Sequence, residues 1–250
     1  MRVLDLFSGI GGFSLGLERA GMETVAFCEY DEKCRQVLRK HWPDVPIHED
    51  VRTLDGRQFR GTVGLVCGGY PCQPFSVAGK REGTADDRHL WPEFFRIIRE
   101  CQPTWVLAEN VAGHINMGLD EVLSDLESEG YTSQPFVIPA CAIDAPHRRD
   151  RGWVVGHTGK DVADPTARRL PQPEHEPRKQ FTVGGTTPIG AFLTDSGWWS
   201  VEPNVGRVAN GIPGRVDRLK QLGNSVVPQI PEIIGRAIMS CNHIGRLSAR

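Results

Sequence analysis

The chain has 250 residues, of which 39% are hydrophobic and 24% are charged, a composition typical of a soluble globular protein with one large core. No apolar run approaches the roughly 20 residues that cross a bilayer, and the polar, glycine-rich start MRVLDLFSGIGG is unlike a secretory signal. These features argue against a membrane protein and predict a cytoplasmic one. The net charge of −2 indicates no particular partner.

Short apolar runs alternate with amphipathic stretches along most of the chain. Strands are predicted at 1–7, 24–29, 46–50, 64–69, 104–110, 133–140 and 151–157, and helices at 12–21, 31–42, 91–101, 118–130 and 228–240. This alternation predicts an α/β fold, a Rossmann-like and mostly parallel sheet with helices on both faces. Ligands of such sheets bind at the carboxyl ends of the strands, where the glycine and polar residues gather here.

The composition changes after His157. Residues 158–217 are rich in Pro, Gly, Thr and Arg and show little periodicity, which predicts a small irregular lobe, before a short helix at 228–240 docks back on the sheet. Residues 1–145 hold 14 Lys and Arg against 22 Asp and Glu, a balance of −8, whereas residues 146–250 hold 15 against 9, a balance of +6. A basic second part suits contact with phosphates, although a solvated charged surface explains it equally well.

A glycine turn, FSGIGG at Phe7–Gly12, links the first predicted strand to the first helix. Glycines there let backbone amides approach a ligand at a helix N-terminus. Glu29 ends the second strand and Asp50 the third, where an acidic side chain can bind ribose hydroxyls or an adenine amino group. The turn has the pattern G-x-G-G rather than G-x-G-x-x-G, so a tight turn without a ligand stays open, but the two acidic residues favour an adenosyl ligand.

Seven cysteines occur without C-x-x-C spacing or a histidine cluster, so no zinc site is predicted. Cys28, Cys67 and Cys101 lie in apolar segments and are predicted to be core residues. Cys72 differs, because it follows a strand in the proline-stiffened loop GGYPCQPFS, a position suited to presenting a thiolate to a cleft.

Two further polar clusters occur at strand ends. Glu109 in AENV follows the apolar run WVLA, and partial burial there would raise its pKa and suit it to protonating a ring nitrogen. In HRRDR, Arg149 and Arg151 would point the same way from an extended chain and hold a base carbonyl and a phosphate. Each pattern alone also fits a structural role: a salt-bridge partner for Glu109, and a basic surface turn for the arginines.

Taken together and in this order, FSGIGG, GGYPCQPFS, AENV and the arginine pair resemble the DNA cytosine-5 methyltransferases of compact bacterial or phage type. LGNSVVPQIPEIIGRAI at 222–238 is similar to the closing motif of that family, which completes the cofactor pocket. The resemblance implies a catalytic domain of residues 1–157 and 219–250 and a small target-recognition region of residues 158–218. It also implies S-adenosylmethionine as methyl donor, double-stranded DNA as substrate, and a restriction endonuclease as a companion of the enzyme.

The resemblance assigns roles residue by residue. It implies Cys72 as the nucleophile that adds to C6 of a flipped cytosine, Glu109 as the acid at N3, and Arg151, with Arg149 beside it, as support for O2. Cofactor-pocket positions are Phe7, Gly9, Ile10, Gly11, Gly12, Glu29, Tyr30, Asp50, Val51, Pro71, Leu90, Asn224, Ser225 and Val226. Expected DNA contacts are Ser76, Arg168, Arg169, Arg178 and Lys179.

The chain departs from the family in three places, and rival functions stay open. His147 stands where the family usually has Gln, and the recognition region of about 60 residues is short for the family. The arginine-rich motif that typically precedes the closing motif has only VGRVANGIPGRVDRL as its nearest counterpart. A tRNA methyltransferase of the same lineage has similar motifs, although the separate basic region favours duplex DNA. A non-catalytic DNA-binding relative is disfavoured by the intact Cys72, Glu109 and Arg151, and a nucleotide-dependent oxidoreductase leaves the cysteine loop unexplained.

Overall fold

The computed structural model describes residues 1–71, 90–113, 118–145, 147–159 and 222–248. Their strands are β1 Arg2–Leu6, β2 Glu23–Cys28, β3 Ile47–His48, β4 Leu65–Gly69, β5 Trp105–Val111, β6 Thr132–Pro139 and β7 Asp150–His157. The α-helices are α1 Gly12–Arg19, α2 Glu32–His41, α3 Trp91–Cys101, α4 Leu119–Ser128 and α6 Gln229–Ser248, and two short 3-10 helices are η1 Gly56–Phe59 and η5 Ala140–Ile143.

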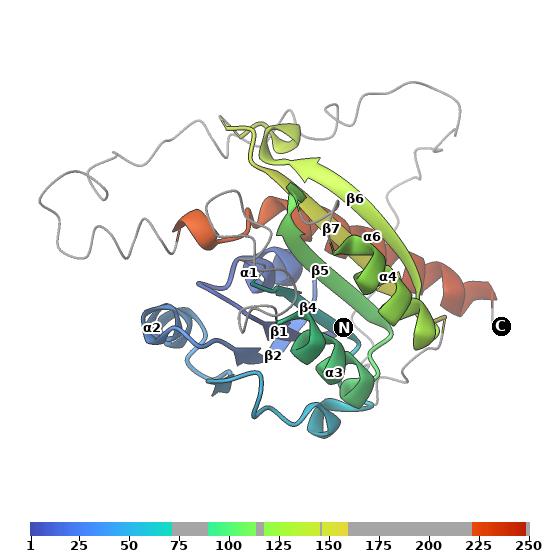
Figure 1. The fold of residues 1–250 in the computed structure, drawn as a ribbon, viewed down its shortest axis with the longest axis horizontal. Helices are drawn as coiled ribbons and strands as arrows, with labels where there is room; N and C mark the ends of the chain where they lie inside the picture. The colour runs from blue at the N-terminus through green and yellow to red at the C-terminus, as the bar shows by residue number, and fades with distance from the viewer. Residues whose placement is uncertain (72–89, 114–117, 146, 160–221, 249–250) are drawn as a thin grey trace, which may run out of the picture.

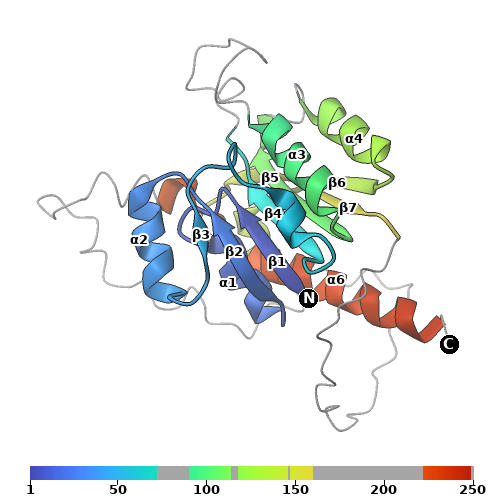
Figure 2. The same cartoon turned by 90° about the horizontal axis from the view of Figure 1, so that it is seen from below.

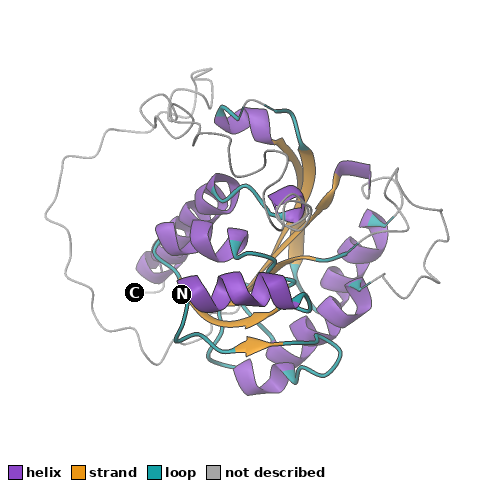
Figure 3. Ribbon diagram, turned by 90° about the vertical axis from the view of Figure 1, so that its left-hand side faces the viewer, coloured by secondary structure: helices purple, strands orange, loops and turns teal. Residues whose placement is uncertain are grey.

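One seven-stranded sheet, in the order β3-β2-β1-β4-β5-β7-β6, organises these elements (Figure 1). The strands from β3 to β5 are parallel, and β7 pairs antiparallel with both β5 and β6. The prediction of a mostly parallel α/β sheet is therefore confirmed. Helices cover both of its faces (Figure 3).

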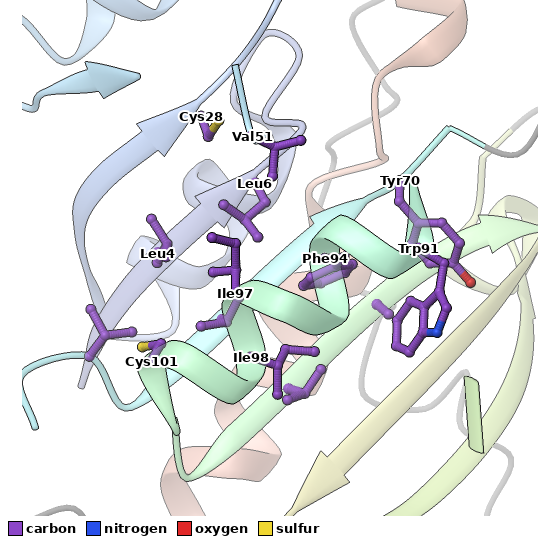
Figure 4. Close-up of a cluster of buried hydrophobic side chains, with 14 of the residues drawn as sticks. Leu4, Leu6, Cys28, Val51, Tyr70, Trp91, Phe94, Ile97, Ile98 and Cys101 are labelled. Atoms are coloured by element: carbon purple, nitrogen blue, oxygen red, sulfur yellow. The ribbon is translucent and has the colours of Figure 1, made fainter. Parts of the chain in front are cut away.

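The core forms two layers, one on each face of the sheet. On one face, α3 buries Trp91, Phe94 and Ile97 in a cluster with Leu4 and Leu6 of β1 (Figure 4). Val122 of α4 belongs to the same cluster. On the other face lie α1 and α6 (Figure 2). They bury Phe13, Leu17, Ile230 and Ile238 in a cluster with Val3, Leu65 and Leu107. Burial of these large apolar side chains on both faces holds the strand ends in fixed relative positions.

The helix α6 packs closely on α1 by means of glycines. A Cβ added at Gly235 would lie 2.9 Å from Cβ of Ala20, and one added at Gly16 would collide with the backbone at Pro228 and Glu232. The prediction of a short helix at 228–240 was wrong about its length, because α6 continues to Ser248. No described helix is long and apolar enough to cross a membrane.

Candidate active site

The carboxyl ends of four parallel strands meet at one edge of the sheet. Leu6 at the end of β1 is in register with Cys28 of β2 and with Gly68 of β4, and Gly69 of β4 is in register with Glu109 of β5. The segments that follow β1, β2 and β4 carry the glycine turn, Glu29 and the start of the cysteine loop, and Glu109 lies near the carboxyl end of β5. The structure therefore brings most of the predicted motifs to one edge.

The glycine turn has the backbone conformation that its sequence requires. Gly9 and Gly11 have positive φ angles of 55° and 86°, in the left-handed region that glycine tolerates. A Cβ at Gly11 would lie 2.6 Å from the ring of Trp42, whereas one at Gly9 would meet no atom within 4 Å. Phe7 also has a positive φ, 53°, and its ring packs edge-on against Phe94. The turn is fixed on its protein side and faces open space at Gly9.

Glu29, just after β2, is held beside the glycine turn. One carboxylate oxygen accepts a hydrogen bond from the Gly9 amide and the other from the Asp31 amide, each at 2.7 Å. Burial raises the pKa of Glu29, against the effect of these two hydrogen bonds. Each oxygen keeps a lone pair that can accept a ligand hydroxyl, which fits an adenosyl ribose. Tyr30, the next residue, is 76% exposed.

Two arginines outside every sequence motif hold the loops at this end of the sheet. Arg35 of α2 donates to the carbonyls of Glu29 and Tyr30, at 3.1 and 2.7 Å. Arg96 of α3 donates to the carbonyl of Val51 at 2.6 Å. Asp50 accepts a hydrogen bond from the Arg52 amide at 2.9 Å, and Val51 is buried in the core. Both arginines lie on amphipathic helices, where their charge alone predicts only an exposed face.

Cys72 and Ser76 lie outside the described residues, and the approach to Cys72 is described as far as Pro71. Tyr70 is buried, and its ring lies 5.3 Å from that of Trp91. The Asn110 amide donates to the Tyr70 carbonyl at 3.1 Å. Asn110, which sequence reasoning missed although it lies in AENV, therefore ties the start of the cysteine loop to β5.

Glu109 points away from Asn110, toward the α1 face of the sheet, and pairs with Arg151. The Arg151 Nε lies 3.0 Å from a Glu109 carboxylate oxygen, and only 11% of the Glu109 side chain is exposed. Burial raises the pKa of Glu109 to about 7, although Arg151 and Arg149 oppose the rise. Gly69 leaves room for this carboxylate, because a Cβ there would lie 3.0 Å from it. A carboxyl group with this pKa exchanges protons readily near neutral pH.

Arg149 does not follow the prediction that it would point the same way as Arg151 from an extended chain. Its φ is 38°, and β7 begins only at Asp150, so the alternation of an extended strand does not reach it. Its Nη2 donates to the carbonyls of Gly223 and Ser225, at 2.8 and 2.6 Å. The two guanidinium groups therefore have different partners.

The segment before α6 lies over the glycine turn. A Cβ on Gly12 would come 2.7 Å from the Val226 carbonyl oxygen and 3.0 Å from the Ser225 hydroxyl. Asn224 is exposed, while Leu90, half-buried, caps the start of α3. Arg168, Arg169, Arg178 and Lys179 lie outside the described residues, as does most of the predicted recognition region. No group of side chains that would hold a metal ion occurs among the described residues.

Similar sequences occur among known proteins. The family model for C-5 cytosine-specific DNA methylases matches residues 1–196. The Type II methyltransferase M.Eco47II of Escherichia coli is 40% identical over 169 residues, which cover 65% of this chain and 40% of that protein. M.AquIA of Picosynechococcus sp. is 33% identical over 203 residues, 72% of this chain and 79% of that protein. The chain spans well under half the length of several relatives, 37% in the case of M.HgiCII of Herpetosiphon aurantiacus.

Solved structures show the same fold. A prophage-encoded protein of E. coli, described as a putative DNA modification methyltransferase, superposes with a TM-score of 0.53 at 32% identity, over 63% of this chain and 47% of that one. A DNMT2 mutant from Spodoptera frugiperda gives 0.54 at 20% identity over 70% and 53%, a likeness of fold alone. With the family match over more than three quarters of its length, the chain belongs to the C-5 cytosine-specific DNA methylase family.

Proposed function

We propose that the chain transfers a methyl group from S-adenosylmethionine to carbon 5 of cytosine in double-stranded DNA. The observation that carries this proposal is the buried Glu109–Arg151 pair, which lies at the strand edge where the Cys72 loop begins. Burial raises the pKa of the Glu109 carboxyl group to about 7, so it can hold or release a proton near neutral pH. The position of that group beside a cysteine loop suits acid catalysis on a ring.

The glycine turn and Glu29 suit the methyl donor. Gly9 borders open space, Glu29 offers acceptors for ribose hydroxyls, and Ser225–Val226 lies over the first turn of α1. These residues, with Asp50 at the next loop, would hold S-adenosylmethionine at the strand ends. When bound, that cofactor supplies an electrophilic methyl group on a sulfonium centre.

The residues of the chain would activate the base. A cytosine within a duplex is stacked and out of reach, so the base must be flipped out, at a cost of a few kcal/mol. The Cys72 thiolate adds to C6, while Glu109 donates a hydrogen bond or proton at N3 and Arg151 holds the ring edge. The added electron pair makes C5 nucleophilic, so C5 would take the methyl group and leave S-adenosylhomocysteine behind. Solvent would then accept the C5 proton, and the electron pair of the C5–H bond would re-form the C5–C6 double bond and expel the Cys72 thiolate.

Residues 158–218 would supply sequence recognition, and their basic run of Arg168, Arg169, Arg178 and Lys179 suits contact with phosphates. The similarity to Type II methyltransferases supports a cytoplasmic enzyme that protects DNA alongside a restriction endonuclease. The first test is bisulfite sequencing of genomic DNA and tRNA from cells that express the chain and lack cytosine methylation of their own. Methylated cytosines in one DNA sequence context would support the proposal, and methylation of tRNA alone would contradict it.

A further inference from the structure

Arg149 contacts the segment that lies over the glycine turn. A residue whose role was to touch the target base would not be expected to make this contact. Its Nη2 donates to two carbonyls two residues apart, those of Gly223 and Ser225. Hydrogen bonds from a charged donor are stronger than neutral ones, and two from one nitrogen fix the curvature of the backbone that accepts them. Gly223–Val226, the closing segment, is therefore held from the side of β7.

The closing segment is also fixed from the side of the cofactor turn. The Val226 carbonyl and the Ser225 hydroxyl lie against Gly12, closer than a side chain at Gly12 would permit. Val226 and Val227 pack against the core cluster that contains Phe13 and Trp153. The closing segment thus lies between the first turn of α1 and Arg149, so removing Arg149 would free one of its two attachments.

The conformation of Arg149 indicates that this contact is selected rather than incidental. A non-glycine residue with φ of 38° is strained, and such strain persists where the surrounding contacts require the conformation. Burial and the nearby Arg151 lower the pKa of Arg149, although Glu109 opposes the change, so the buried guanidinium needs hydrogen-bond acceptors within the protein. The two carbonyls of the closing segment supply them.

We propose that Arg149 is a positioning residue of the cofactor pocket, which holds the closing segment over the glycine turn, and is not a group that contacts the target base. Arg151, two residues along the chain, contacts Glu109 instead. The two arginines would thus have different roles: Arg151 would contact the target base, and Arg149 would position a segment of the cofactor pocket. This inference rests on the proposed function, because the pocket is taken to bind S-adenosylmethionine.

The test is titration calorimetry with S-adenosylhomocysteine, which needs no DNA and no turnover. Arg149→Asn removes the guanidinium while tolerating the positive φ, and Arg149→Lys keeps the charge with a single donor group. Arg149→Asn should weaken binding about 10- to 100-fold, as expected when hydrogen bonds to a charged donor are removed. Arg149→Lys should recover part of that affinity.

Arg148→Met is the matched control, because Arg148 is 82% exposed and pairs with Asp150. It removes the same charge one residue away and should leave the affinity unchanged. In steady-state assays, Arg149→Asn should raise the KM for S-adenosylmethionine and leave kcat at saturation within about threefold, whereas Arg151→Met should lower kcat.

The outcomes separate this inference from the proposed function. Native affinity in folded Arg149→Asn, with folding checked by urea unfolding, would overturn the positioning role and leave the proposed function standing. A fall in kcat at unchanged affinity would also overturn the positioning role, and Arg149 would then be assigned to catalysis. A native chain that binds no S-adenosylhomocysteine would overturn the proposed function, and this inference with it.

Discussion

Replacing Glu109 with Gln should move activity and stability in opposite directions. The side chain keeps its shape, and its amide oxygen can still accept from Arg151, but it can no longer ionise or donate an acidic proton. Acid catalysis is worth roughly 100- to 10,000-fold, so kcat should fall by a factor in that range. The free energy of unfolding at pH 8 should rise.

The size of that rise follows from the pKa of Glu109. Burial moves it from 4.5 to about 7, and at ~1.4 kcal/mol per pH unit the ionised carboxylate disfavours the folded state by about 3 kcal/mol at pH 8. Because the folded pKa lies above the unfolded one, the folded protein binds more protons between these values, and stability falls as pH rises through that window. Glu109→Gln should therefore gain about 3 kcal/mol at pH 8 and less than about 1 kcal/mol at pH 5.

Urea unfolding of native and variant protein at pH 5 and pH 8 measures this difference directly. Glu127→Gln on the exposed face of α4 is the control and should change stability little at either pH. If Glu109→Gln lowers stability at pH 8, the attraction of Arg151 outweighs burial at this site. Glu109 would then be ionised at neutral pH, and its assignment as an acid would fail.

Three further predictions concern the core, the cofactor turn and the recognition region. Asp5 accepts a hydrogen bond from the Ser14 hydroxyl at 2.7 Å, and burial raises the pKa of Asp5 to about 7. Asp5→Asn should therefore reduce the fall in stability between pH 5 and pH 8. An unchanged difference between the urea midpoints at these two pH values would refute this. Gly12→Ala would crowd the Val226 carbonyl, so calorimetry should show S-adenosylmethionine binding weakened at least roughly tenfold, and native affinity would show that the segment yields at little cost. The basic run consists of Arg168, Arg169, Arg178 and Lys179. Replacing these residues with Ala should reduce the slope of log binding constant against log salt concentration by roughly one unit for each phosphate interaction removed. An unchanged slope would show that the basic run is a solvated loop.

Sequence periodicity was sufficient for most of the fold, because both layers of the core rest on regular apolar spacing. The helix α3 buries Trp91, Phe94, Ile97, Ile98 and Cys101 on one face, a spacing that only a helix explains. The length of α6 was not predicted, because the helical spacing of apolar residues becomes less clear after Met239. The sequence after that point has no proline to end the helix, and Gly245 lies within it. The end of a helix is set by capping residues and chain geometry, and the weakening of apolar periodicity does not identify the last helical residue.

At the site, strand ends were predictable and side-chain partners were not. Glu29 follows β2 and Glu109 lies near the carboxyl end of β5, so their place at this end of the sheet follows from the strand pattern. The pairing of Arg149 with Gly223 and Ser225 joins residues more than 70 positions apart through a left-handed backbone, which no local pattern encodes. Arg35 and Arg96 escaped for the same reason, because their acceptors are backbone carbonyls of other elements.

The most direct test of the central proposal is covalent trapping at Cys72. Enzyme and S-adenosylmethionine are mixed with duplex DNA that carries 5-fluorocytosine at the site identified by bisulfite sequencing, and the products are run on a denaturing gel. Fluorine cannot leave as a cation, so the adduct should persist after methyl transfer and give a shifted band that Cys72→Ala abolishes. A band that survives Cys72→Ala would assign the nucleophile to another thiol, and no band with native enzyme on a verified site would contradict the proposed mechanism.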